Sequence, residues 1–167
     1  MKNRPVLFSV LALALLITGC HIKAKQAKKY HDDMMAVVSV VVDSSLNYGD
    51  AIQSGDKQRA ETAYKQYSGL VNKSIEKVQT FGDFQGDTTL RSFSLELLDF
   101  YKSTLDSQFG PFLASVKKDN FTAAESQRAD SLYSKMTMTE NQYWQRFDWA
   151  EKKFYKEHDI AAVEEKK

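Results

Sequence analysis

Residues 60–81 read AETAYKQYSGLVNKSIEKVQTF, and their pattern predicts the fold class. Apolar and small side chains recur at steps that alternate between four and three residues, which aligns them along one face of an α-helix. This stripe consists of Ala60, Tyr64, Tyr67, Val71, Ser74, Val78 and Phe81. A seven-residue rhythm of this kind is typical of helices that pack against each other in a bundle.

Three other segments carry a similar rhythm. The segment before this one has the stripe Met34, Val38, Val41, Ser45, Tyr48 and Ile52. The next segment has a broader apolar face, formed by Leu90, Phe93, Leu97, Leu98, Phe100, Tyr101, Leu105, Phe109, Phe112 and Val116. The last has the stripe Ala129, Leu132, Met136, Thr139, Tyr143, Trp144, Phe147, Ala150, Phe154, His158 and Ala161. Because short loops make consecutive helices antiparallel, we predict an all-α fold, an up-down-up-down four-helix bundle with long helices.

Turn-forming residues separate the four segments at Ser54–Asp56, Phe81–Asp87 and Lys118–Asn120. Asp56, and either Asp87 or Thr88, are suited to cap the helices that follow them. Thr122 and Glu125 have the spacing of a capping box, in which each side chain accepts a hydrogen bond from the other residue's backbone N–H. These signals place the helix boundaries.

Two segments inside the predicted helices allow a second interpretation. Gly110–Pro111 falls within the third helix, where proline lacks a backbone N–H and crowds the preceding turn. We expect a kink there, or a break that makes residues 112–118 a separate short helix. Val37–Val42 is rich in β-branched residues and could form a strand. We predict helix there, because the segment lies within a longer helical stripe and a lone strand would have no partner.

The N-terminus has the pattern of a secretory signal. Lys2 and Arg4 precede an apolar run over residues 6–17, which is shorter than the roughly 20 residues that a membrane-spanning helix needs. A short transmembrane anchor is the alternative interpretation. Residues 17–20, Ile-Thr-Gly-Cys, resemble a bacterial lipobox, which is cleaved before its cysteine and acylated on that cysteine.

The lipobox resemblance implies cleavage between Gly19 and Cys20 and lipid attachment to Cys20, the only cysteine in the chain. The sequence then divides into a lipoprotein signal peptide (1–19), a lipidated cysteine with a short basic tether (20–29), a four-helix bundle domain (30–162) and a frayed tail (163–167). We expect regular helix only from about residues 26–30, because the lysines of the tether oppose a helix N-terminus. Lipid on Cys20 would anchor the protein to a membrane of the bacterial cell envelope, the outer membrane in preference to the inner, facing the periplasm or the cell surface.

Composition excludes several classes of function. Charge is nearly balanced, with 23 Lys and Arg against 22 Asp and Glu in 167 residues, whereas nucleic-acid-binding domains are usually basic. A single cysteine permits no intrachain disulfide and no multi-cysteine metal site. The chain contains no G-x-S-x-G, P-loop or dinucleotide-binding motif. We therefore expect neither an enzyme nor a cofactor, and no nucleic-acid partner.

The bundle topology places the start of the first helix beside the end of the fourth. This could bring His31 near Glu157 and His158, which makes these residues weak candidates for a divalent metal site. The favoured interpretation is a polar, solvated end of the bundle, because no inward Glu-x-x-His pair is present. Asp83 and Asp87 faintly resemble a calcium loop, but its other ligands are missing and turn formation explains both residues.

Six aromatic residues crowd the last helical segment and span more than one of its faces. They are Tyr143, Trp144, Phe147, Trp149, Phe154 and Tyr155. The helical rhythm predicts that Trp149 is the least buried of them. Exposed Trp and Tyr often mark binding surfaces. The candidate binding surface therefore consists of Tyr143, Trp144, Trp149 and Tyr155.

Four short segments, Lys29–Asp32, Phe84–Asp87, Phe100–Tyr101 and Glu140–Phe147, resemble a group of bacterial surface or periplasmic lipoproteins of similar length that join a lipobox to a four-helix body. The resemblance implies the fold and the envelope location, and it brings no catalytic residues. We expect a non-catalytic interaction or scaffold module that binds an envelope protein or a surface polymer. The alternative is a carrier of a metal ion or small apolar ligand, held at the end of the bundle or in a core opened by Ser45, Ser74, Thr104 and Thr139.

Overall fold

The computed structural model describes the backbone of residues 4–160 and the side chains of residues 22–160. Its elements are α1 (Arg4–Gln53), α2 (Lys57–Gln79), α3 (Thr89–Thr104), the π-helical turn η1 (Leu105–Phe109), α4 (Gly110–Ser115) and α5 (Ala123–Glu157). No strand occurs in this described part, so the predicted all-α fold is confirmed. The side chains of the predicted signal peptide and of Cys20, and the predicted tail at 163–167, lie outside the described residues.

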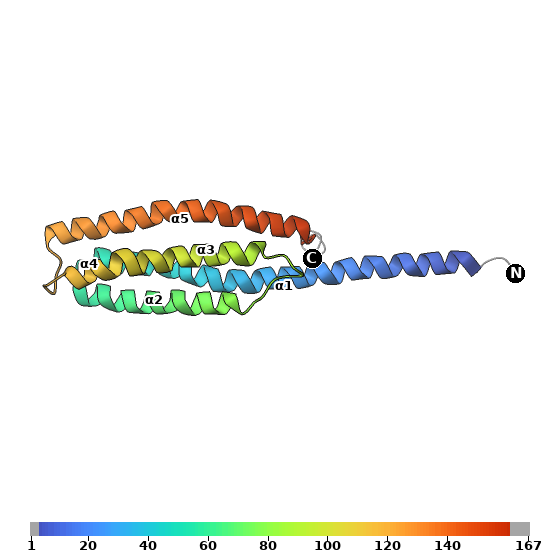
Figure 1. Ribbon diagram of the computed structural model, residues 1–167, viewed down its shortest axis with the longest axis horizontal. Helices are drawn as coiled ribbons and strands as arrows, with labels where there is room; N and C mark the ends of the chain where they lie inside the picture. Colours follow the sequence, from blue (N-terminus) through green and yellow to red (C-terminus); the bar gives the residue numbers. More distant parts are fainter. Residues whose placement is uncertain (1–3, 161–167) are drawn as a thin grey trace.

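The helices form a bundle of four columns that lie side by side (Figure 1). α1 packs on α2, α2 packs on the column formed by α3, η1 and α4, α3 packs on α5, and α5 also contacts α1. Successive columns run in opposite directions (Figure 1). The N-terminal part of α1 extends beyond the ends of the other helices. The two faces α1–α2 and α3–α5 consequently lie on opposite sides of the bundle.

The predicted stripes form the core of this bundle. Every member of the α1 stripe is buried, and so is every member of the α2 stripe except the half-buried Tyr64 and Phe81. Aromatic rings fill much of the interior, where Tyr48 stacks on Tyr67 with 5.1 Å between ring centroids and meets the edge of Phe109. Each buried aromatic side chain removes about 150–250 Å² from water, which stabilises the bundle.

α1 begins earlier than expected. Regular helix is present before residues 26–30, and Ala24 and Ala27 are already buried. The tether lysines are tolerated because Lys28 and Lys29 form ion pairs with aspartates one turn later, and because Ala, Lys and Gln are good helix formers. The predicted helix over Val37–Val42 is confirmed.

The third column changes its hydrogen-bonding pattern without breaking at Gly110–Pro111. In η1 the backbone N–H of Gly110 donates to the carbonyl of Leu105, five residues back. The wider turn accommodates Pro111, which has no N–H to donate. Helix continues to Ser115, so residues 112–118 are not a separate helix, and the expected disruption lies in the turn before the proline.

The predicted capping residues lie at the starts of the helices. Asp56 caps α2 through its side chain, and Thr122 begins the capping box of α5. At α3 the capping bond comes from Asp87, whose carboxylate accepts a hydrogen bond from the backbone N–H of Thr89 (2.7 Å). The caps fix the direction in which each helix leaves its loop.

At the end of the bundle that is remote from residue 20, two loops are joined by hydrogen bonds between their backbones. The N–H of Lys57 donates to the carbonyl of Asp119 (2.9 Å), and the N–H of Phe121 donates to the carbonyl of Gly55 (2.7 Å). Gly55 has a φ of +74°, a conformation that glycine adopts without strain. The α1–α2 and α4–α5 connections therefore form one closed end.

Candidate functional sites along the last helix

α5 contacts α3 on one side and α1 on the other, so its aromatic residues face two different neighbours. Tyr143 and Trp149 contact aromatic rings of α3, whereas Tyr155 meets His31 of α1 edge-on. Trp144 is half-buried, and its indole N–H points to a carboxylate in the core. The predicted binding surface is therefore not one continuous patch.

A strip of aromatic and basic side chains follows the boundary between α3 and α5. It consists of Phe93, Tyr143, Arg146, Trp149 and Lys153, and is called the α3–α5 strip below. Trp149 meets Phe93 edge-on with 5.7 Å between ring centroids. The Lys153 ammonium lies 5.7 Å from the Trp149 ring, and the Arg146 guanidinium lies 5.4 Å from the Phe93 ring. Cation–π contacts of this kind hold long basic side chains against the rings.

Trp149 is the exposed centre of this strip. Its exposed fraction is 55%, whereas Phe147 and Phe154 on the same helix are buried. The prediction that Trp149 is the least buried of the six aromatic residues is confirmed. Arg146 also forms an ion pair with Glu96 at 2.7 Å, and its guanidinium lies over the rings of Phe93 and Tyr143.

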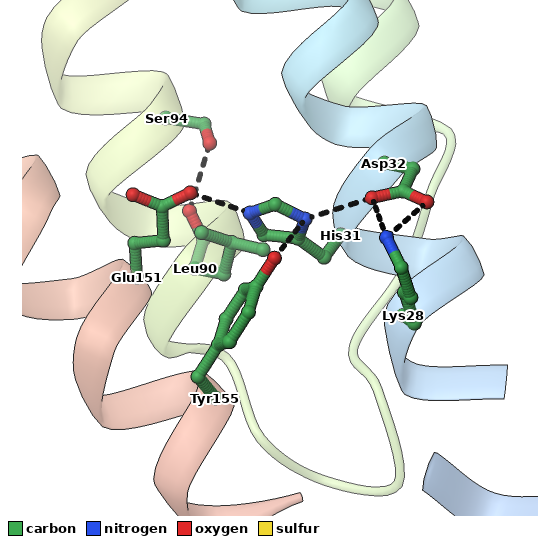
Figure 2. A network of polar contacts seen from close by, with 7 residues as sticks. All are labelled: Lys28, His31, Asp32, Leu90, Ser94, Glu151 and Tyr155. Carbon is green, nitrogen blue, oxygen red and sulfur yellow. Dashed lines mark hydrogen bonds and ion pairs between the residues drawn. The ribbon is translucent and has the colours of Figure 1, made fainter. Parts of the chain in front are cut away.

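On the other side of α5, a buried imidazole joins this helix to α1 (Figure 2). His31 is 6% exposed, and its Nε2 lies 2.6 Å from Oε1 of Glu151. Its Nδ1 lies 3.2 Å from Oδ1 of Asp32 and 3.4 Å from the Tyr155 hydroxyl. Asp32 in turn forms an ion pair with Lys28 at 2.9 Å. Two helices thus contribute to one polar network within a largely apolar bundle.

The geometry of this network favours a protonated His31. Both ring nitrogens face carboxylate oxygens, which accept hydrogen bonds, and only the imidazolium form donates from both nitrogens. Burial opposes the charge, but the hydrogen bonds to Glu151 and Asp32 outweigh burial and raise the pKa of His31 above its ordinary value of 6.5. The network is therefore a charged clamp between α1 and α5.

The three weak metal candidates are not brought together. His31 belongs to the clamp, Nε2 of His158 lies 3.0 Å from Oδ2 of Asp87, and Glu157 lies 3.9 Å from Nζ of Lys153. Within residues 22–160, no group of three or more His, Cys, Asp or Glu side chains has the arrangement of a metal site. This end of the bundle instead contains histidine–carboxylate pairs that join α5 to α1 and to the α2–α3 loop.

The loop that faintly resembled a calcium loop connects elements of the bundle. Asp83 accepts a hydrogen bond from the guanidinium of Arg91 (3.1 Å), and Asp87 caps α3. The hydroxyl of Tyr30 on α1 donates to the carbonyl of Gly82 (2.9 Å). Both aspartates therefore serve the turn and its attachment.

One functional-looking group was not predicted from the sequence: a buried carboxylate at the centre of the bundle. Glu140 is 9% exposed, and its Oε1 accepts hydrogen bonds from the Tyr101 hydroxyl (2.6 Å) and the Trp144 indole (3.4 Å). These donors compensate a group that is costly to bury alone. The signal was present in the sequence, because Glu140 lies four residues after buried Met136 and seven before buried Phe147, on the core stripe itself.

No protein-family model, curated protein or solved structure matches the chain. Among the described residues, no helix combines the length and the apolar character that crossing a membrane requires.

Proposed function

We propose that the protein is a lipid-anchored lipoprotein of the bacterial cell envelope, and that it binds another envelope protein through the α3–α5 strip without catalysing a reaction. The anchor is supported by Ile-Thr-Gly-Cys at residues 17–20, directly after a basic end and a short apolar run. The observation that carries the binding role is Trp149, a large indole left 55% exposed.

The composition of the strip supports a protein partner. Protein interfaces are enriched in Trp, Tyr and Arg, and a few such residues supply most of the binding energy. Trp149 is held by Phe93 and Lys153, and Arg146 is held by Phe93 and Glu96. Because these contacts restrict the side chains before binding, less conformational entropy is lost when a partner is bound.

The anchor and the strip are compatible in space. Cys20 lies four residues before Ala24, the first buried residue among the described side chains, so a lipid on Cys20 would hold the bundle close to the membrane. The strip lies on helices that are packed along their length, and it would be presented at a fixed distance from the membrane surface. A rigid spacer of this kind suits a scaffold.

The test is crosslinking of intact envelopes followed by affinity purification of the wild type, Trp149→Ala and Met138→Ala. Met138 is 69% exposed on the same helix but outside the strip, so it is the matched control. We expect a specific protein with the wild type and the control, and recovery lowered about tenfold or more by Trp149→Ala. Equal recovery with both variants would remove the strip from the interface, and no specific protein with the wild type would contradict the proposed function.

A further inference from the structure

The part of α1 that directly follows residue 20 is basic and contains no acidic residue. Residues 21–29 read HIKAKQAKK, with four lysines and no Asp or Glu. The first carboxylates after Cys20 are those of Asp32 and Asp33, about one helical turn further along α1. Positive charge is therefore concentrated at the end of the bundle nearest Cys20, although the chain as a whole is nearly neutral.

The four lysines differ in their partners. Lys28 and Lys29 form ion pairs with aspartates one turn later. Lys23 and Lys25 are exposed, and neither forms an ion pair with a described residue. Three carboxylates of the α2–α3 loop and of α5 at this end have basic partners of their own: Asp83, Asp87 and Glu157. Lys23 and Lys25 thus carry charge that the bundle does not use.

An exposed apolar side chain accompanies these lysines. Ile22 is 57% exposed and lies two residues after Cys20. Steps of three and four residues place Ile22, Lys25 and Lys29 on one face of α1. Ala24 and Ala27, on the opposite face, are buried. An apolar side chain beside lysines is typical of helical segments that lie at a membrane surface.

Lys23 and Lys25 are also close to the proposed anchor. An α-helix rises about 1.5 Å per residue, so the backbone of Lys23 lies about 4.5 Å from that of Cys20 along the helix axis, and the backbone of Lys25 about 7.5 Å. Both distances are within the screening length of about 8 Å at physiological ionic strength. A lipid on Cys20 would therefore hold both lysines within reach of headgroup charge, whatever the tilt of the helix.

We propose that Ile22, Lys23 and Lys25 bind the surface of a membrane rich in anionic phospholipid. The two ammonium groups would lie among headgroups of net negative charge, and Ile22 would enter the boundary between headgroups and acyl chains. The inference rests on the lipid anchor of the proposed function, and it adds a preference for one class of lipid. The α3–α5 strip takes no part in it.

The test is competition between two kinds of vesicle for the full chain, isolated from bacterial membranes in detergent and diluted into an equal mixture of both. One kind contains phosphatidylcholine alone, and the other contains equal parts of phosphatidylcholine and phosphatidylglycerol. The vesicles are separated by density, and the protein on each is measured. We expect the wild type to favour the anionic vesicles about tenfold or more, because one lysine beside an anionic surface strengthens binding about fivefold.

Lys23→Gln/Lys25→Gln should reduce this preference at least fivefold. The matched control is Lys117→Gln/Lys118→Gln, which removes two exposed lysines at the remote end of the bundle and should behave like the wild type. In about 1 M NaCl the screening length falls to about 3 Å, so the preference should disappear. A preference that survives in Lys23→Gln/Lys25→Gln, or that falls equally in the control, would overturn the proposal.

Vesicles of phosphatidylcholine alone separate this proposal from the lipid anchor. A wild type that binds them firmly, but divides equally between the two kinds in the mixture, would overturn the role of the lysines and leave the anchor in place. A wild type that binds only the anionic vesicles would support the role of the lysines and contradict the anchor. Binding to neither kind would overturn both.

Discussion

His31 on the first helix and Glu151 on the last lie 2.6 Å apart, although 120 positions separate them in the sequence. The pair bridges α1 and α5, and Asp32 and Tyr155 complete its surroundings (Figure 2). A buried imidazolium between two carboxylates stabilises the closed bundle only while it keeps both protons. The contact between first and last helix is therefore sensitive to pH.

Glu151→Gln should lower the free energy of unfolding by about 1–3 kcal/mol at pH 6, because a charge-assisted hydrogen bond is lost. The pKa of His31 is raised in the folded protein, so its stabilisation is complete below the ordinary value of 6.5 and is lost as pH rises through the folded pKa. The difference between wild type and variant should therefore shrink at pH 9. Urea unfolding at both pH values measures it, with Glu157→Gln as an exposed control; a difference independent of pH would contradict the role of His31.

Gly49→Ala should destabilise the protein, whereas Gly69→Ala should stabilise it. A Cβ at Gly49 would overlap the ring of Tyr133, while a Cβ at Gly69 on α2 would meet no atom within 4 Å. We expect a loss of about 1–3 kcal/mol at Gly49 from overpacking and a gain of up to about 1 kcal/mol at Gly69 from helix propensity. Thermal unfolding followed by circular dichroism compares them, and a stabilising Gly49→Ala would mean that Tyr133 moves freely.

Tyr48→Phe and Tyr101→Phe remove the same atom with opposite expected results. The Tyr48 hydroxyl has no hydrogen-bond partner among the described residues, so its removal should leave stability unchanged or raise it slightly. The Tyr101 hydroxyl donates to buried Glu140 at 2.6 Å, so its removal should cost about 1–3 kcal/mol. Urea unfolding at pH 7 distinguishes the two, and equal effects would show that Glu140 finds another donor.

Cys20→Ala should release the protein from membranes while the bundle remains folded. The proposed anchor is the lipid on this one cysteine, and the core residues that hold the bundle together lie between Ala24 and Ile160, so we expect the variant to fold. Fractionation of cells into membrane and supernatant, with circular dichroism of the released protein, tests both statements. Continued membrane attachment of the variant would favour the transmembrane-anchor interpretation of residues 6–17.

Most of the fold could be predicted because its determinants are local. The spacing of Val38 and Val41 placed a β-branched segment in a helix, and Asp56 and Thr122 marked helix starts by their own capping chemistry. The start of α1 was placed too late because the helix begins at Arg4, so the lysines of residues 23–29 lie in its interior and not in the first turn, where they would oppose the helix dipole. The π-helical turn was not predicted. A proline in the sequence shows that one backbone hydrogen bond is lost, but it does not show how the preceding turn rearranges its hydrogen bonds.

The sites were less predictable because they depend on pairing between distant segments. His31 and His158 were expected to lie near each other, but each has its own carboxylate partner, Glu151 and Asp87. The exposure of Trp149 was predicted correctly. The position of a residue around the helix, relative to the buried stripe, determines whether that residue is exposed. The same spacing rule places Glu140 on the buried face of α5. It was not predicted because a charged residue is not usually expected in a core.

The paired loops give the two ends of the bundle different dynamics. Backbone hydrogen bonds from Lys57 to Asp119 and from Phe121 to Gly55 have no titratable group, so the far end should remain closed over a wide pH range. At the near end, side chains that include His31 and His158 make the corresponding ties between segments. We therefore expect amide exchange with solvent to be faster at the His31 end of the bundle than in the paired loops, and slowest in the buried middle of the helices. An anchored bundle of this design would loosen next to the membrane while its outer end stayed shut.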